Sequence, residues 1–188
     1  MPKVGNNPIL KKVSGMLGDT IVFRQGPDGT VMSNAPKKSG ILTDAQITLR
    51  SRFMSAVNYG RRSMQKPDVL AMYEAGVDRK RKSAYTVAVS DYLSVPRIHQ
   101  IDAKRYLGAV GQEVHVHASD DFRVQTVEVA IQNAAGAVVE QGEANLSEEL
   151  HQVWIYIAKT ENISLAGTII TVTARDIPGN VATQALKL

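Results

Sequence analysis

Apolar and polar side chains alternate with a period of two through the second half of the sequence, from about Pro96 to Leu188. This period places successive side chains on opposite faces of a β-strand, so each run has one face for a core. Four runs show the pattern: Val114, Val116 and Ala118; Val127, Val129 and Ile131; Val153, Ile155 and Ile157; and Ile170, Val172 and Ala174. Turn-forming residues follow at 133–136 and 176–180. About seven short strands in about 90 residues are typical of an antiparallel β-sandwich.

The end of the chain resembles the last hairpin of bacterial immunoglobulin-like (Ig-like) domains. In the segment from Ile169 to Ala182, an apolar strand ends in Ala-x-Asp, turns through Gly-Asn and returns. The opening at Pro96 and the strand end from Ala118 to Asp121 are similar to the same family. The resemblance implies an Ig-like sandwich over residues 95–188. It implies no single function, because such domains occur in adhesins, as spacers in polysaccharide-active enzymes, and on phage heads, tails and related injection machines.

The first forty residues predict a β-hairpin. Two short β-branched runs, Thr20–Gln25 and Thr30–Ser33, flank Gly26–Gly29, where proline presets φ and glycine accepts positive φ. A lone hairpin is marginal in water and needs a third strand or a helix against its apolar face. We therefore expect either the following helices or a neighbouring subunit to cover it.

A long amphipathic helix should follow the hairpin. Thr43 and Gln46 fit a capping box, so the helix is expected to begin near Asp44 and to end near Arg62. Its apolar stripe recurs at spacings of three and four: Leu49, Phe53, Ala56 or Val57, and Gly60.

Two further segments complete the first half of the chain. Pro67 suits the first turn of a shorter helix that closes at Gly76. Residues 84–93 suit a helix or a buried strand; we favour the helix, because Ser83 can cap it and Pro96 stops it. The sequence therefore predicts an α+β chain in two parts, with a β-hairpin and two or three helices over residues 1–94 and an antiparallel Ig-like β-sandwich over residues 95–188.

The two halves carry opposite charge. Residues 1–100 hold 16 Lys and Arg against 7 Asp and Glu, a balance of +9, whereas residues 101–188 hold 6 against 11, a balance of −5. Opposite signs suggest two modules with different partners, or one molecule whose basic end meets the acidic end of the next. Two domains that drifted to different surface charges explain the counts equally well.

Targeting signals and cysteine chemistry are absent from the sequence. Met1 to Leu10 hold polar residues and two prolines, and no apolar run of a signal peptide follows. No apolar stretch approaches the roughly 18 residues of a transmembrane helix. We expect the chain in the cytoplasm or in an assembled particle, without membrane contact. With no cysteine, the fold must rest on packing and hydrogen bonds alone.

Two groups of residues could bind a metal ion. His115 and His117 share one side of a predicted strand, but a third ligand is missing locally, and an exposed polar sheet face explains the pair equally well. Oxygen donors at predicted strand ends are Asp120, Asp121, Asp176 and Asn180. Calcium binds between such loops in some sandwich domains, but no EF-hand-like run accompanies these residues, and hydrogen bonds that close the turn are the preferred interpretation.

No catalytic motif is present. The sequence has no Gly-x-Ser-x-Gly, no Walker-type Gly-x-x-x-x-Gly-Lys and no His-Glu-x-x-His. We therefore predict no enzyme activity, no catalytic residue, no cofactor and no metal.

The leading hypothesis is a structural or assembly subunit of a phage-like particle, injection machine or filament. Its basic N-terminal part would dock onto another protein, with a homo-oligomer or larger assembly as the product, and the Ig-like domain would act as a spacer or packing module. The residues predicted to interact are Arg61, Arg62, Arg79, Lys80, Arg81, Lys82, Phe23 and Arg24. Nucleic acid is not the favoured partner, because no recognition motif accompanies these cations.

The competing hypothesis is an adhesion or ligand-binding module that recognises polysaccharide or a cell surface through the sandwich. Trp154 and Tyr156 alternate with aliphatic residues, so both rings share one strand face. On an outer face they would support sugar stacking, whereas in the core they would count against it. With a single Trp in the chain, we favour the core.

Overall fold

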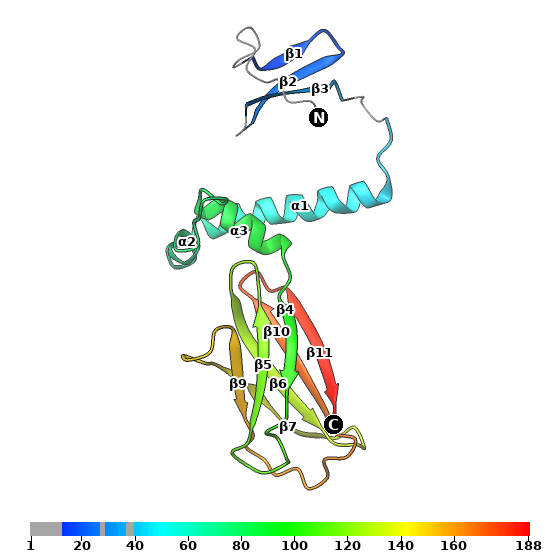
Figure 1. Ribbon diagram of the computed structural model, residues 1–188, viewed down its shortest axis with the longest axis vertical. Helices are drawn as coiled ribbons and strands as arrows, with labels where there is room; N and C mark the ends of the chain where they lie inside the picture. The colour runs from blue at the N-terminus through cyan, green and yellow to red at the C-terminus, as the bar shows by residue number, and fades with distance from the viewer. Residues whose placement is uncertain (1–12, 27–28, 37–39) are drawn as a thin grey trace. The chain divides into compact units, whose positions relative to one another are not determined.

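The computed structural model describes residues 13–26, 29–36 and 40–188 and shows an α+β chain (Figure 1). The described residues form three helices and three antiparallel sheets. The chain divides into two compact units, Met1–Ile47 and Thr48–Leu188. The sequence predicted a boundary near residue 94 instead, and the observed division places almost all of the helical part with the sandwich.

The first unit contains a three-stranded antiparallel sheet. Its strands are β1 (Gly15–Leu17), β2 (Ile21–Gly26) and β3 (Gly29–Asn34). β2 is the central strand, paired with β1 on one side and with β3 on the other. The predicted turn residues 27 and 28 lie outside the described residues. Because β2 is paired on both sides, β1 and β3 are the outer strands of this sheet among the described residues.

Three helices follow, and two of them begin at capping boxes. They are α1 (Asp44–Ser63), α2 (Pro67–Glu74) and α3 (Ala84–Leu93). For α1, the Gln46 backbone N–H donates to Thr43 Oγ1 at 3.3 Å, and the Thr43 N–H donates to Gln46 Oε1 at 3.0 Å. For α3, Ser83 and Thr86 make the same reciprocal pair. Each cap satisfies backbone donors that the first turn of a helix leaves unpaired, which fixes where the helix begins.

The apolar stripe predicted for α1 is buried only toward its C-terminal end. Ala56 and Gly60 are buried, but Leu49 and Phe53 are 67% and 51% exposed. Helices α1 and α3 approach closely at Gly60 of α1, where an added Cβ would lie 2.9 Å from Cγ2 of Val89 in α3. With half as many residues as α1, α3 extends about 15 Å against about 30 Å, so it cannot cover the whole stripe.

The helical part has a small core that the sandwich helps to build. Tyr73 of α2 and Val87 of α3 are fully buried in it. Phe122, from the sandwich, packs on the Tyr73 ring with centroids 5.1 Å apart. Asn180 Nδ2 donates to the Ser94 carbonyl at 2.7 Å, which ties the end of α3 to a sandwich turn. These shared contacts explain why no boundary falls between the helices and the sandwich.

The sandwich has two four-stranded antiparallel sheets, of order β11-β10-β6-β7 and β4-β5-β9-β8 (Figure 1). Its strands are β4 (Arg97–Asp102), β5 (Glu113–Ser119), β6 (Val124–Gln132), β7 (Val138–Glu143), β8 (Asn145–Leu146), β9 (Val153–Ile157), β10 (Ile169–Asp176) and β11 (Val181–Lys187). The alternation seen in the sequence reappears as alternating burial along β5, β6 and β10. The core-facing residues of these three strands are Val114, Val116 and Ala118; Val127, Val129 and Ile131; and Ile170, Val172 and Ala174.

Candidate functional site

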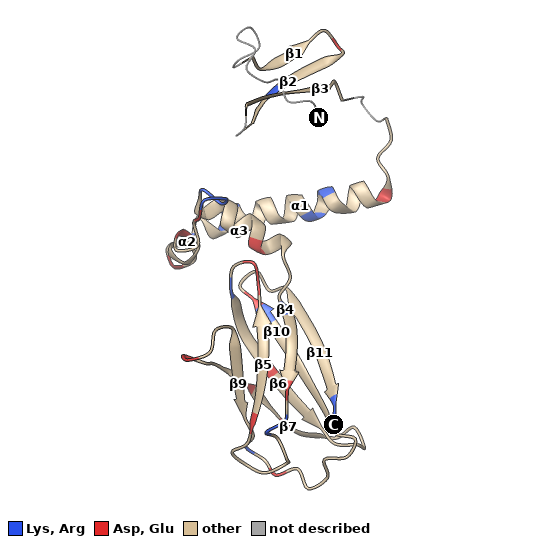
Figure 2. Ribbon diagram, viewed as in Figure 1, with Lys and Arg blue, Asp and Glu red and all other residues tan. Residues whose placement is uncertain are grey.

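Six of the seven predicted interacting cations occupy two places in the second unit (Figure 2). Arg61 and Arg62 lie in the last turn of α1, and both are exposed. Arg79, Lys80 and Lys82 lie in the loop between α2 and α3, and they too are exposed. Nothing in the fold of this unit therefore covers these five side chains.

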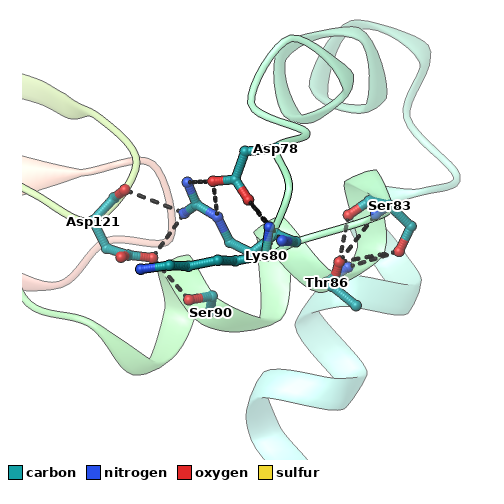
Figure 3. Close-up of polar contacts among 7 residues, drawn as sticks. Asp78, Lys80, Ser83, Thr86, Ser90 and Asp121 are labelled. Carbon is teal, nitrogen blue, oxygen red and sulfur yellow. Dashed lines mark hydrogen bonds and ion pairs between the residues drawn. The ribbon is translucent and has the colours of Figure 1, made fainter. Parts of the chain in front are cut away.

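Arg81 differs from its neighbours because its guanidinium pairs with two carboxylates, those of Asp78 and Asp121, which are labelled in Figure 3. Its guanidinium lies 2.8 Å from Asp78 Oδ2 and 2.9 Å from Asp121 Oδ2. Hydrogen bonds from the backbone and side chain of Arg81, together with the Lys80 N–H, lower the pKa of Asp78 to about 2. Ser90 of α3 also donates to Asp121, at 2.7 Å. Arg81 thus links the α2–α3 loop to the turn after β5.

Phe23 and Arg24 lie on β2, the central strand of the first unit. Phe23 is buried, and its backbone is placed between Gly15 of β1 and Met32 of β3. Arg24 is exposed. Of this predicted pair, only Arg24 presents its side chain to solvent, and any added strand would have to join the sheet at β1 or β3.

The aromatic residues of β9 belong to the sandwich core. Trp154 is 9% exposed and Tyr156 is 1% exposed. The Tyr156 hydroxyl donates to Glu140 Oε2 at 2.9 Å, and burial is the first cause of its raised pKa. Both rings are buried, as favoured from the sequence, so these two residues do not form the outer aromatic face that would support sugar stacking.

A cluster of exposed apolar side chains lies on the N-terminal half of α1. Leu49, Phe53 and Met54 are each more than half exposed. With Arg50 and Leu93 they line a shallow groove of about 510 Å³. We call these five residues the α1 patch. Apolar side chains gathered on one helix face, next to an arginine, form a surface suited to contact with another protein.

A second exposed surface, on the sandwich, is both acidic and apolar. It lies around β8 and the loop before β9, and consists of Glu143, Leu146, Glu148, Glu149 and Leu150, all of them exposed. Leu146 and Leu150 are 55% and 46% exposed. We call this surface the acidic loop. Its composition is complementary to that of the α1 patch.

Three carboxylates meet where α3 joins the end of the sandwich. Asp91 comes from α3, Asp120 from the turn after β5, and Asp176 from the end of β10. One oxygen of each lies within 4.8 Å of the others. We call these three residues the carboxylate cluster. Among the residues that the structure describes, this is the one group of acidic and histidine side chains close enough to share a metal ion.

Asp91 is the most enclosed member of the carboxylate cluster. It is 0% exposed, and its Oδ2 accepts a hydrogen bond of 2.6 Å from the Tyr73 hydroxyl, which lies 2.7 Å from that of Tyr59. Burial raises the pKa of Asp91 to about 7. The Tyr73 hydrogen bond opposes the rise, whereas the charges of Asp120 and Asp176 and a hydrogen bond between the Asp91 and Asp120 side chains add to it. A carboxylate in this environment is destabilised unless a proton or a cation compensates its charge.

The other two members have different surroundings. Asp176 Oδ1 accepts from the backbone N–H groups of Gly179 and Asn180 at 2.8 and 2.6 Å, so it closes the turn as the sequence predicted. Asp120 has both side-chain oxygens buried without a hydrogen-bond partner. Asp121, the other candidate named from the sequence, points instead to Arg81.

Sequence reasoning found two members of the carboxylate cluster and missed the third. Asp91 lies in a helix, and no local spacing connects it with Asp120 or Asp176. Its position in an otherwise apolar helix face was the available signal, because α3 buries Asp91 together with Val87 and Ala88. His115, the other metal-binding candidate from the sequence, lies outside the cluster and contacts Glu113 instead, with its Nε2 2.8 Å from Glu113 Oε2.

Comparisons with known proteins add no relative. No family model matches the sequence, and neither the curated proteins nor the solved structures include a significant match. Within the described residues, no helix has the length and apolar character needed to cross a membrane.

Proposed function

We propose that this chain is a non-catalytic assembly subunit, in which the α1 patch of one copy docks onto the acidic loop of the next. The observation that carries the proposal is the exposure of Leu49, Phe53 and Met54 on a helix whose other end is well packed. In this proposal the C-terminal sandwich is an Ig-like spacer or packing module. Its resemblance to Ig-like domains supports this part of the proposal.

The energetics favour a contact in which apolar and charged groups act together. Burying the exposed halves of the three apolar side chains would contribute about 3–4 kcal/mol. Association costs at least about 4 kcal/mol in lost translational and rotational freedom. The apolar part of the α1 patch is therefore insufficient alone, and attraction between the basic first half and the acidic second half of the chain is needed as well.

The proposed contact joins two different surfaces, so it is heterologous. Such contacts give closed rings or open filaments, according to whether the rotation between copies closes. Because opposite charges contribute, assembly should weaken as the salt concentration rises from about 0.05 to 0.5 M. β1 and β3, the outer strands of the first sheet in the described part of the chain, offer a further place where an assembled neighbour can add a strand.

The test is sedimentation velocity of the full chain over a hundredfold range of concentration, at low and at high salt. The double variant Phe53→Ser, Met54→Ser should shift the protein toward monomer. These side chains are exposed, so the folded chain should lose little stability. Ile163→Ser is the matched control, because Ile163 is 94% exposed but lies outside both surfaces.

Assembly in the wild type and in Ile163→Ser, but not in the double variant, would support the proposal. A strict monomer at every concentration and salt would overturn self-assembly. Assembly that survives the double variant would overturn the role of the α1 patch. Charge reversal at Glu148 and Glu149 tests the other side of the contact, and it should weaken assembly in the same way.

A further inference from the structure

No cationic side chain among the described residues pairs with the carboxylate cluster. Asp91, Asp120 and Asp176 bring three acidic groups together at the junction of α3 and the sandwich. The ion pairs of Arg81, Arg105 and His115 go to Asp78, Asp121 and Glu113, not to the cluster. Three adjacent carboxylates without a cation repel one another, and burial strengthens that repulsion.

Several oxygens of the carboxylate cluster are buried without a donor from the protein. Asp91 is 0% exposed, yet its Oδ1 has no hydrogen-bond partner. Both carboxylate oxygens of Asp120 are also buried without a partner. Buried polar atoms are almost always satisfied, because an unpaired one costs about 1–3 kcal/mol and a charged one costs more. Three such atoms in one cluster are explained together by a single cation.

The spacing of the oxygens fits one hard cation. Calcium takes oxygen ligands at about 2.3–2.6 Å, so two oxygens on the same ion lie at most about 5 Å apart. The three carboxylates each have an oxygen within 4.8 Å of the others. A purely oxygen donor set does not suit zinc, which prefers nitrogen and sulfur ligands. Magnesium keeps several water molecules and requires shorter, near-ideal octahedral contacts, so this crowded set suits calcium better.

The carboxylate cluster lies near the protein surface on one side. Asp120 lines a groove of about 660 Å³ together with Ser94 and Ser119, although its two carboxylate oxygens are buried.

We propose that Asp91, Asp120 and Asp176 bind a single Ca²⁺ ion that fastens α3 to the end of the sandwich. The ion joins a helix, the turn after β5 and the end of β10, which are far apart in sequence. Bound calcium therefore stabilises the junction between the helical part and the sandwich. This site goes beyond the proposed assembly function and stands or fails separately from it.

The experiment compares the full chain, freed of metal with EDTA and then dialysed, with and without CaCl₂ or MgCl₂. Calorimetric titration measures stoichiometry, and thermal unfolding measures stabilisation. At a calcium concentration about 100 times Kd, the Tm of the Thr48–Leu188 unit should rise by about 5–10 °C. Terbium luminescence excited through tyrosine gives a local readout, because Tyr73 contacts Asp91 directly.

Asp120→Asn is the test variant, because no backbone N–H and no hydroxyl, amide or cationic side chain donates to the Asp120 oxygens. It should weaken calcium binding about 100-fold or more, since even substitutions beside a metal ligand cost 10–100-fold. Asp120→Ala removes the ligand oxygen entirely and guards against coordination by the new amide. Asp121→Asn makes the same change in charge one residue away, on a carboxylate that pairs with Arg81, and should keep calcium binding.

One calcium ion per wild-type chain, lost in both Asp120 variants and kept in Asp121→Asn, supports the site. The absence of calcium binding and of any Tm shift in the wild type would overturn it, leaving a cluster neutralised by protons. Equal Tm shifts in the wild type and in Asp120→Ala would place the ion elsewhere, which also overturns the proposal. Stabilisation by magnesium as large as that by calcium would overturn the choice of ion.

Discussion

Replacing Asp120 with Asn should stabilise the calcium-free protein at pH 8, although it removes a native side chain. Burial first, and then the charges of Asp120 and Asp176, raise the pKa of Asp91 from 3.8 to about 7, while a hydrogen bond from Tyr73 opposes the rise. That difference in pKa corresponds to a loss of at most about 4 kcal/mol in the free energy of unfolding when Asp91 ionises in the folded state. Because burial is the largest cause, the share due to Asp120 is smaller, about 1 kcal/mol. A new hydrogen bond from the Asn amide can add about 1 kcal/mol more.

The raised pKa of Asp91 also makes the stability of the calcium-free protein depend on pH. The groups that face Asp91 are Tyr59, Tyr73, Asp120 and Asp176. Since the pKa of Asp91 is higher in the folded chain than in the unfolded one, the folded state binds more protons between about pH 4 and 7. The contribution of Asp91 to stability should therefore fall as pH rises through this range, and should level off above pH 7. Asp120→Asn should make this fall shallower.

Urea unfolding in EDTA, followed by the fluorescence of Trp154, measures both effects. Trp154 is the single tryptophan and lies in the sandwich core, so it reports on the unit that contains the cluster. We expect Asp120→Asn to raise the free energy of unfolding by about 1–2 kcal/mol at pH 8. The control Asp121→Asn should lower it, because that carboxylate accepts hydrogen bonds from Arg81 and Ser90. A destabilised Asp120→Asn at pH 8 would refute the account of repulsion within the cluster.

Two glycines provide further tests of packing. Gly108→Ala should lower the free energy of unfolding by about 3 kcal/mol or more, because φ is +93° and the new Cβ would lie 2.3 Å from the Asn162 carbonyl oxygen. The control Gly111→Ala, where φ is +84° but no atom lies near the new Cβ, should lower it by only about 1–2 kcal/mol. Equal losses for the two variants in urea unfolding would contradict this prediction. Gly60→Ala should lower the free energy of unfolding by about 1 kcal/mol, because crowding of the new Cβ against Val89 outweighs the gain in helix propensity. A more stable variant in the same assay would show that α1 and α3 can move apart to accommodate the methyl group.

The sequence predicted the elements of this chain that depend on local chemistry. The capping pair Thr43–Gln46 and the cap residue Ser83 placed the starts of α1 and α3, because a cap depends only on residues next to the first helical turn. The period-two runs identified core-facing residues such as Val116, because alternation in a strand follows directly from backbone geometry.

The remaining features depend on contacts between distant segments. Periodicity showed which face of α1 is apolar, but α3 covers only part of that face, so Phe53 stays exposed. The boundary expected near residue 94 does not appear, because Phe122 packs on Tyr73 across it. Asp91 joins the carboxylate cluster only through the packing of α3 against the sandwich, which no spacing in the sequence reveals.

The central claim, that one copy docks onto the next, is tested most directly by photocrosslinking at position 53. A photoreactive phenylalanine analogue replaces Phe53, and this protein is mixed with isotope-labelled wild-type chains before irradiation. We predict crosslinks from position 53 to residues 143–150 of the labelled copy, which mass spectrometry distinguishes from links within one chain. Crosslinks only within a chain, or to other regions of the labelled copy, would contradict the proposed docking.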